Sequence, residues 1–379
     1  MVWFKTLRLK SSNPQVRQRA VEGLAGSDNQ HDTELVVASL EDENPQVRCA
    51  AVRALETAPA ESCTQAFLLA LRDQASEVRA SAARVLGRRG DPGMAGPLSF
   101  LLNDSSSETR EAAANALRQL GWRPSNSEEL ARFEIALGNT RAAAGLGKVA
   151  VAPLLGELKQ DTSFHRRAAA DALKELNDPR RVTPLLDALA DSDPSVRVSA
   201  VHALELETNE TVTAELLKLL RDSDSNVRLA AAQVLARRPD PPPAHFLPLL
   251  RDANFEIRVA AVQFLGGLAH PDIGEALVPM LSDPDNDVRH VAAKALGEMR
   301  CPSAVEFLVV TLADEERLVR LAAEHALEQI DRNWPQSEFS QRAVVRLEAL
   351  LNERPSWVRS AILQVLEKIR AVPNPGTFQ

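Results

Sequence analysis

The chain has 379 residues, of which 45% are hydrophobic, 25% charged and only 4% aromatic, and its formal net charge is −8 at pH 7. This balance excludes a disordered chain. The acidic charge argues against generic binding to nucleic acid or to an anionic membrane, because both favour a basic protein surface.

A segment centred on an arginine recurs along the chain, mostly at intervals of 31 residues, and a leucine follows each arginine by seven residues. The arginines are Arg17, Arg48, Arg79, Arg110, Arg166, Arg197, Arg228, Arg258, Arg289, Arg320 and Arg359. Self-similarity at this period is typical of an array of stacked structural repeats. We therefore predict eleven repeats.

Each repeat contains two predicted helices. In the second helix of one repeat, Val47, Ala50, Ala51, Ala54 and Leu55 have the i, i+3, i+4, i+7, i+8 spacing of an apolar helix face. A similar stripe marks the preceding helix, and a short polar turn separates the two. Because a lone helical hairpin cannot bury its apolar face, the hairpins must stack on one another.

The arginine forms part of a second periodic pattern, since an acidic residue stands six positions before most of the arginines. The residues of this predicted structural ladder are Asp42, Arg48, Asp73, Arg79, Asp104, Arg110, Asp191, Arg197, Asp222, Arg228, Asp252, Arg258, Asp283, Arg289, Asp314 and Arg320. We expect the aspartate to cap the start of the next helix. We expect the arginine to reach the turn of an adjacent repeat and bind its carbonyls or its aspartate. Catalysis needs one unique site, so a periodic pattern favours a structural role.

This combination resembles the HEAT repeat, because a helical pair of about 31 residues carries the Asp-x5-Arg pair and an Ala-Ala-x-x-Leu second helix. More narrowly, it resembles the short-period prokaryotic subclass first named for phycobilin lyases. The resemblance covers nearly the whole chain. It implies an all-α, right-handed α-solenoid of about eleven HEAT-like helical hairpins, a scaffold that serves many unrelated functions.

The period is broken once, between Arg110 and Arg166. We therefore predict a four-repeat array over 1–120, a helical insertion over 121–145, a seven-repeat array over 146–370 and a flexible tail over 371–379.

Within the insertion we expect a helix that is capped by Ser127 and stopped at Gly138, followed by a short helical piece over Thr140–Leu146. Two hypotheses stay open for this segment. Either Trp122 and Phe133 pack it onto the edge of the solenoid, or it contacts a partner.

No catalytic or metal-binding motif is present. Gly145-Leu-Gly-Lys148 is not a phosphate-binding loop, because the first glycine and the hydroxyl residue of that motif are missing. Cys49, Cys63 and Cys301 are too scattered for a zinc site or a disulfide framework. Deoxyhypusine hydroxylase, an enzyme built from HEAT repeats, carries iron on His-Glu dipeptides, and this chain has none. We expect no cofactor, no metal and no catalytic residue.

The remaining candidate is a surface, formed by the positions one and five after each arginine, which point away from the apolar stripe. In HEAT solenoids that face is concave. Between Val198 and His325 it is unusually apolar for a solvated face, and flanking imidazole and amide groups could bind a peptide or a partner helix. The alternative is that the apolar residues only lean onto neighbouring repeats. The predicted partner-binding residues are Val198, His202, Leu229, Gln233, Val259, Gln263, His290, Lys294, Leu321 and His325.

The leading hypothesis is a non-catalytic scaffold that binds a protein or peptide partner, located in the cytoplasm and monomeric, without binding nucleic acid or membrane. The second hypothesis is a phycobilin lyase-like enzyme or accessory subunit that acts on a chromophore-carrying protein. A third, DNA binding in the manner of a HEAT-like glycosylase, is disfavoured by the charge.

Overall fold

The computed structural model describes residues 7–27, 29–238, 241–268, 270–352 and 354–371, and within these ranges it contains helices and turns but no β-strand. The predicted all-α fold of stacked helical hairpins is therefore confirmed. The chain divides into two compact units, Met1–Ala188 and Leu189–Gln379. Residues 372–379 of the predicted tail lie outside the described ranges.

The first unit contains short α-helices that alternate with polar turns and single 3-10 turns. Its α-helices are α2 (Pro14–Glu22), α3 (Gln30–Ala38), α4 (Pro45–Ala54), α5 (Ala60–Ala70), α6 (Ser76–Arg89), α7 (Ala95–Phe100), α8 (Ser107–Gln119), α9 (Ser127–Ala136), α10 (Thr140–Ala144), α11 (Val151–Glu157), α12 (Ser163–Lys174) and α13 (Val182–Ala188). Its 3-10 turns are η1 (Ser39–Glu41), η2 (Pro92–Met94), η3 (Leu101–Asn103), η4 (Gly147–Ala150) and η5 (Pro179–Arg181).

The second unit has the same kind of elements. Its α-helices are α14 (Pro194–Ala203), α15 (Glu210–Leu219), α16 (Ser225–Ala236), α17 (Phe255–Gly267), α18 (Pro271–Leu277), α19 (Asn286–Glu298), α20 (Val305–Thr311), α21 (Arg317–Ile330), α22 (Glu338–Leu350) and α23 (Ser356–Arg370). Its 3-10 turns are η6 (Pro243–His245), η7 (Leu247–Arg251), η8 (Val278–Ser282), η9 (Pro302–Ala304) and η10 (Trp334–Gln336).

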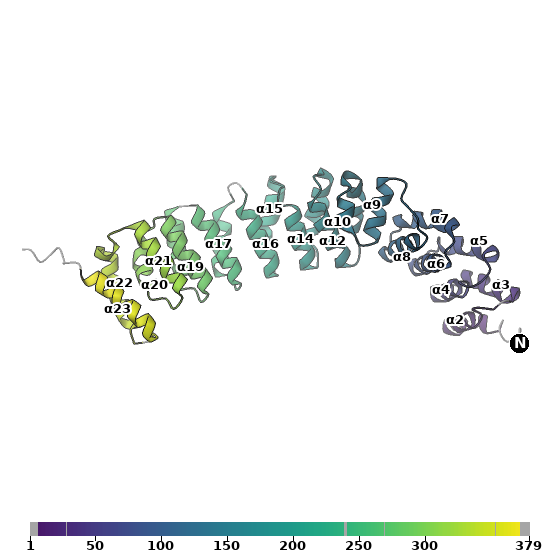
Figure 1. Ribbon diagram of the computed structural model, residues 1–379, viewed down its shortest axis with the longest axis horizontal. Helices are drawn as coiled ribbons and strands as arrows, with labels where there is room; N and C mark the ends of the chain where they lie inside the picture. The colour runs from purple at the N-terminus through teal and green to yellow at the C-terminus, as the bar shows by residue number, and fades with distance from the viewer. Residues whose placement is uncertain (1–6, 28, 239–240, 269, 353, 372–379) are drawn as a thin grey trace, which may run out of the picture. The chain divides into compact units, whose positions relative to one another are not determined.

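Within each unit, the second helices of successive repeats pack side by side. Helix α4 packs between α2 and α6, and α6 also packs on α8. In the second unit, α14, α16, α17, α19 and α21 form a similar row (Figure 1). This row sets the position of the candidate binding face.

The core consists of the apolar stripes that the sequence predicts. In α4 the five residues of the stripe, from Val47 to Leu55, are at most 7% exposed. The leucine seven residues after the arginine is buried in every repeat, including Leu86, Leu204 and Leu327. Burying one leucine contributes roughly 2 kcal/mol, so this recurring contact is a major source of stability.

Glycines let some second helices approach closely. A Cβ on Gly266 would lie 2.6 Å from the Cβ of Ala295, and one on Gly297 would lie 2.6 Å from the Cα of Ala326. Both glycines stand eight residues after a ladder arginine. At these positions α17, α19 and α21 contact each other through backbone.

The insertion forms one more hairpin within the first unit. Helix α9 contacts α8 and α11, and α10 contacts α12. Trp122 and Phe133 pack on each other with ring centroids 5.6 Å apart, and both pack against the core of this unit. The predicted helices form, but the N-cap is Asn126 rather than Ser127: the Asn126 Oδ1 accepts the N–H of Glu129 at 2.9 Å. Gly138 ends α9 with a φ of 83°.

One predicted helix is absent from its repeat. The first element of the repeat that contains Arg258 is formed by the 3-10 turns η6 and η7. Pro243 and Pro248 each lack the N–H that an α-helix needs, which explains the change. Phe246 is still fully buried, so the repeat keeps its core. Pro239 and Asp240 lie outside the described ranges.

Candidate functional site

Most ladder arginines join consecutive repeats through two hydrogen bonds to backbone carbonyls and two to an aspartate carboxylate. Arg48 donates from Nη1 to the carbonyls of Asp42 (2.8 Å) and Glu43 (3.2 Å), in the turn before its own helix. Its Nε and Nη2 donate to the two carboxylate oxygens of Asp73, in the next turn, at 2.7 and 2.8 Å. The guanidinium therefore connects one turn to the next in a bidentate geometry, which favours arginine over lysine.

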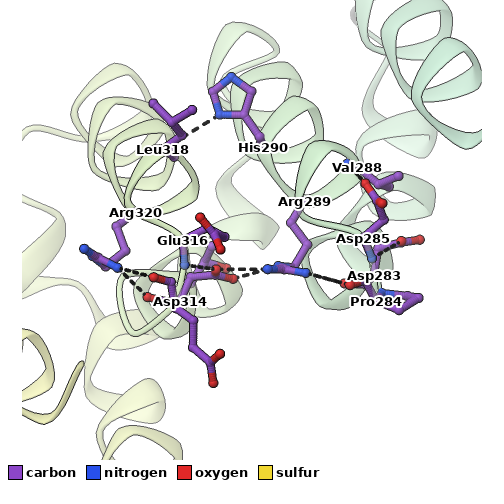
Figure 2. A network of polar contacts seen from close by, with 12 residues as sticks. Asp283, Pro284, Asp285, Val288, Arg289, His290, Asp314, Glu316, Leu318 and Arg320 are labelled. Carbon is purple, nitrogen blue, oxygen red and sulfur yellow. Dashed lines mark hydrogen bonds and ion pairs between the residues drawn. The ribbon is translucent and has the colours of Figure 1, made fainter. Parts of the chain in front are cut away.

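The same bidentate contact recurs in both units. The pairs are Arg17–Asp42, Arg48–Asp73 and Arg79–Asp104, then Arg197–Asp222, Arg228–Asp252, Arg258–Asp283 and Arg289–Asp314. Figure 2 shows Arg289 between the carboxylate of Asp314 and the carbonyls of Asp283 and Pro284. Arg320 donates to the Asp314 carbonyl and also stacks on Trp357, with Cζ 5.0 Å from the ring centroid.

The aspartate binds backbone in a different way from the one predicted. Asp73 Oδ1 accepts the N–H of Ala75, two residues later, and Asp191 Oδ1 accepts that of Asp193 in the same way. These contacts order the turn. In most repeats the residue two places after the aspartate is the N-cap, and in α14 it is Asp193, whose own carboxylate accepts the Ser195 N–H. The ladder aspartate therefore positions the cap and does not itself cap the helix.

These contacts favour the charged forms of both partners. Burial raises the pKa of the Asp73 carboxyl, but the hydrogen bonds from Arg48 and from the Ala75 N–H, together with the charges of Arg48 and Arg79, outweigh burial and hold the pKa below its usual value. The pKa values of Asp42, Asp104, Asp222 and Asp252 are lowered for the same reasons. The hydrogen bond to Asp73 raises the pKa of Arg48 despite desolvation.

The ladder changes at the insertion. Arg110 donates to the carbonyls of its own turn, but its Nη2 contacts Glu157 of α11 at 2.6 Å instead of a turn aspartate. Glu157 is 4% exposed, and the Nδ1 of His165 lies 3.4 Å from its Oε2. A cavity of about 320 Å³ adjoins Arg110 and Glu157 and is also lined by Arg132 of the insertion.

Sequence reasoning missed a second set of inter-repeat contacts at the opposite end of the second helices. Arg238 is 8% exposed and donates to Thr213 Oγ1 of its own repeat (2.7 Å) and to the Leu204 carbonyl of the preceding repeat (3.0 Å). Arg89 donates to three carbonyls of the preceding repeat, including that of Leu55. The sequence feature that could have predicted these contacts is an Arg-Arg dipeptide, Arg88-Arg89 or Arg237-Arg238, which stands nine and ten residues after a ladder arginine.

In the first unit, the positions one and five after the ladder arginine are mostly buried or charged, apart from the half-buried amides Gln18 and Asn115. Cys49 and Ala80 are buried against neighbouring helices. Arg53 Nη2 lies 3.5 Å from Glu22 Oε1, and Arg84 Nη2 lies 2.6 Å from Glu108 Oε1. The arginines at these positions therefore pair with carboxylates of neighbouring helices.

In the second unit, the corresponding positions form what we call the second-helix face: Val198, His202, Leu229, Gln233, Val259, Gln263, His290, Lys294, Leu321 and His325. Val198, Leu229 and Val259 are half-buried, whereas Leu321 is 48% exposed. Gln233 and Gln263 are exposed. His290 Nδ1 lies 3.2 Å from the Leu318 carbonyl, and Leu318 is 67% exposed beside Leu321 on α21 (Figure 2). The structure thus places these residues on successive adjacent helices, and their role in binding stays a prediction.

Metal ligands, thiols and apolar helices in the described part of the chain bear on other possible functions. No group of three His, Cys, Asp or Glu side chains among these residues is placed to hold a metal ion. Cys49, Cys63 and Cys301 are buried thiols, and burial raises the pKa of Cys49 and Cys63. None of the described helices is long and apolar enough to cross a membrane.

The solved structures that resemble the chain do so at low sequence identity. No curated protein matches the chain. Among solved structures, it resembles an engineered protein (22% identity, 97% of this chain and 98% of that one, TM-score 0.29). It also resembles Kap95p in a structure with RanGDP (14% identity, 99% and 62%, TM-score 0.40) and human deoxyhypusine hydroxylase (21% identity, 87% and 96%, TM-score 0.29).

A family model described as HEAT repeats matches six stretches of the sequence, most of which overlap. They are residues 3–62, 64–144, 135–205, 182–247, 243–328 and 274–367. These matches include nearly every repeat that the arginine spacing predicts. The chain belongs to the HEAT-repeat family.

Proposed function

We propose that this protein is a non-catalytic interaction scaffold that binds a protein partner through the second-helix face of its second unit. The observation that carries the proposal is the contrast between the two units at equivalent repeat positions. In the first unit, Arg84 stands at such a position and its charge is paired with Glu108 of the next second helix. In the second unit, the face has apolar side chains, imidazoles and primary amides, with Lys294 as its one formally charged residue.

Physical chemistry supports the second unit over the first as the docking surface. Burying an exposed ion pair removes the hydration of both charges, and the attraction between them compensates for only part of that free energy. Burying Leu321 and the half-buried Val198, Leu229 and Val259 contributes roughly 25 cal/mol for each Å² removed from water. Amide and imidazole groups beside them can form the few directed hydrogen bonds that determine specificity.

Site-specific photo-crosslinking tests the proposal in intact cells. A photoreactive amino acid replaces Gln233, Gln263 or Lys294, whose side chains are exposed, so the replacement should not disturb the fold. In the control it replaces Leu69 of α5, which is 66% exposed. We expect the three face positions to crosslink to one and the same protein and the control position not to do so.

The variant Leu229→Glu/Leu321→Glu should abolish these crosslinks without changing helicity or melting. Leu69→Glu/Val345→Glu, which also adds two charges at exposed apolar positions, should leave them intact. Crosslinks of equal yield from the face and the control would refute the proposal. Recovery of a chromophore-carrying protein would instead support the lyase-like hypothesis.

A further inference from the structure

We propose that the occupant of the second-helix face is an extended segment of the partner in polyproline II conformation, with an apolar residue at every third position. This inference rests on the proposed function. It assigns a conformation, a spacing and a charge to the partner, and each comes from a separate feature of the face.

The first feature is the spacing of the apolar side chains. Val198, Leu229 and Val259 stand one per helix on α14, α16 and α17, which pack side by side. Packed helices have axes about 8–10 Å apart. A polyproline II chain rises about 3.1 Å per residue with three residues per turn, so every third side chain returns to the same face after about 9.3 Å.

Other backbone conformations match this spacing less well. Side chains on one face of a β-strand recur every two residues, or about 6.6 Å. Those on one face of an α-helix recur at about 5.4 Å per turn. A segment that follows the face from Val198 to Leu321 crosses four helix-to-helix steps, which corresponds to about 12 residues of polyproline II.

The second feature is the row of hydrogen-bonding groups beside the apolar residues. Gln233 and Gln263 are exposed, and each carboxamide can both donate and accept. A polyproline II segment has no internal hydrogen bonds, so its carbonyls and N–H groups are free to bind these amides. A bound α-helix already satisfies its own backbone and would cover the amides without offering them backbone partners, which is costly.

The third feature is charge. The ten residues of the face include no acidic side chain, and Lys294 lies between the helices that carry Gln263 and His325. Its one ion pair, to Glu298 of the same helix, is long (3.9 Å) and exposed, so Lys294 can pair with an acidic residue of the partner. We therefore assign an uncharged segment with one acidic residue opposite Lys294. Its strongest anchor would be a large apolar residue near Leu318 and Leu321, which are 67% and 48% exposed on neighbouring turns of α21.

Binding of synthetic peptides to the full chain tests this inference by fluorescence anisotropy. The probe is a fluorescein-labelled peptide of four Leu-Pro-Gln triplets. One control has the same composition with the leucines grouped together, and a second is a helix-stabilised peptide with leucines at i, i+3, i+4 and i+7. We expect the triplet peptide to bind at least tenfold more tightly than either control.

Variants of the chain localise the binding. Leu229→Glu should weaken binding of the triplet peptide by at least tenfold. Gln233→Ala/Gln263→Ala, at exposed positions that cannot disrupt the core, should weaken it about fivefold or more and should not affect the helical peptide. Leu69→Glu is the matched control and should have no effect. Replacing one glutamine of the peptide by glutamate should strengthen binding in a Lys294-dependent manner.

The outcomes separate this inference from the proposed function. If the helical peptide binds in a Leu229-dependent manner and the triplet peptide does not, the extended conformation is refuted and the binding face stands. If neither peptide binds but the crosslinks form, the partner is not of this class and the inference is likewise refuted. If both experiments fail, the inference and the proposed function fall together.

Discussion

Replacing Arg228 with alanine tests whether the ladder holds consecutive repeats together. The change removes the two bonds to Asp252 (2.7 and 2.9 Å) and the bonds to the carbonyls of Asp222 (2.8 Å) and Ser223 (3.1 Å). The Asp252 side chain is only 9% exposed and would lose its counter-ion. Removing one partner of a buried ion pair costs about 3–5 kcal/mol. Because the Arg228 side chain is 16% exposed, we expect about 3 kcal/mol.

The matched control is Arg84→Ala. Arg84 lies on a second helix too, but its side chain is 46% exposed and makes one contact, to Glu108. Such exposed pairs contribute about 0.2–1 kcal/mol. With a urea m-value of about 1–3 kcal/mol/M, Arg228→Ala should lower the unfolding midpoint by about 1 M or more, and Arg84→Ala by clearly less.

Hydrogen exchange identifies where the stability is lost. Each repeat contacts only its neighbours, so loss of protection should centre on α16 and α17. A second variant, Asp252→Asn, keeps an acceptor for the Asn254 N–H but removes the charge, and it should lose most of the same stability. Equal urea midpoints for Arg228→Ala and Arg84→Ala would refute the structural role of the ladder.

Three further predictions concern acid sensitivity, helix packing and the second set of arginines. The pKa of Asp252 is lowered in the folded state from an ordinary value of 3.8. Its contribution to the free energy of unfolding is therefore complete above that value and is lost as the pH falls through the folded pKa. Urea midpoints at pH 7 and pH 3 should accordingly differ less in Asp252→Asn than in the wild type. Gly266→Ala should lower the melting temperature, because the new Cβ would meet Ala295, whereas Gly267→Ala, with open space around it, should not. Arg238→Ala should lower the free energy of unfolding in urea by about 2 kcal/mol, because Arg238 is buried. Arg237→Ala should lower it by about 0.5 kcal/mol or less, because the Arg237 side chain is 67% exposed.

The fold was predictable because its determinants are periodic. Each repeat has the same leucine, such as Leu204, and this leucine is buried throughout the array, as most of the apolar stripe is. The spacing of Asp and Arg placed both residues near the turns. It did not reveal that Asp73 accepts the N–H two residues later, because that role depends on the conformation of the turn and not on helix periodicity.

Contacts that occur once could not be predicted from the period. Glu157 replaces the turn aspartate as the partner of Arg110 because the insertion displaces the next repeat by one hairpin. Likewise, η7 replaces a helix at Pro248, although Phe246 is buried as a helix residue would be. Burial of apolar side chains therefore follows the period more faithfully than backbone hydrogen bonding does, because several backbone conformations can place a side chain in the core.

The second-helix face shows why the exposure of a repeat position depends on its neighbours. The position one after the ladder arginine is buried at Ala80, half-buried at Leu229 and 48% exposed at Leu321. The ladder arginine and the buried leucine repeat at fixed positions, whereas this position carries different side chains with different exposures. Apolar residues recur there on four helices of the second unit, and the crosslinking experiment tests whether a partner binds them.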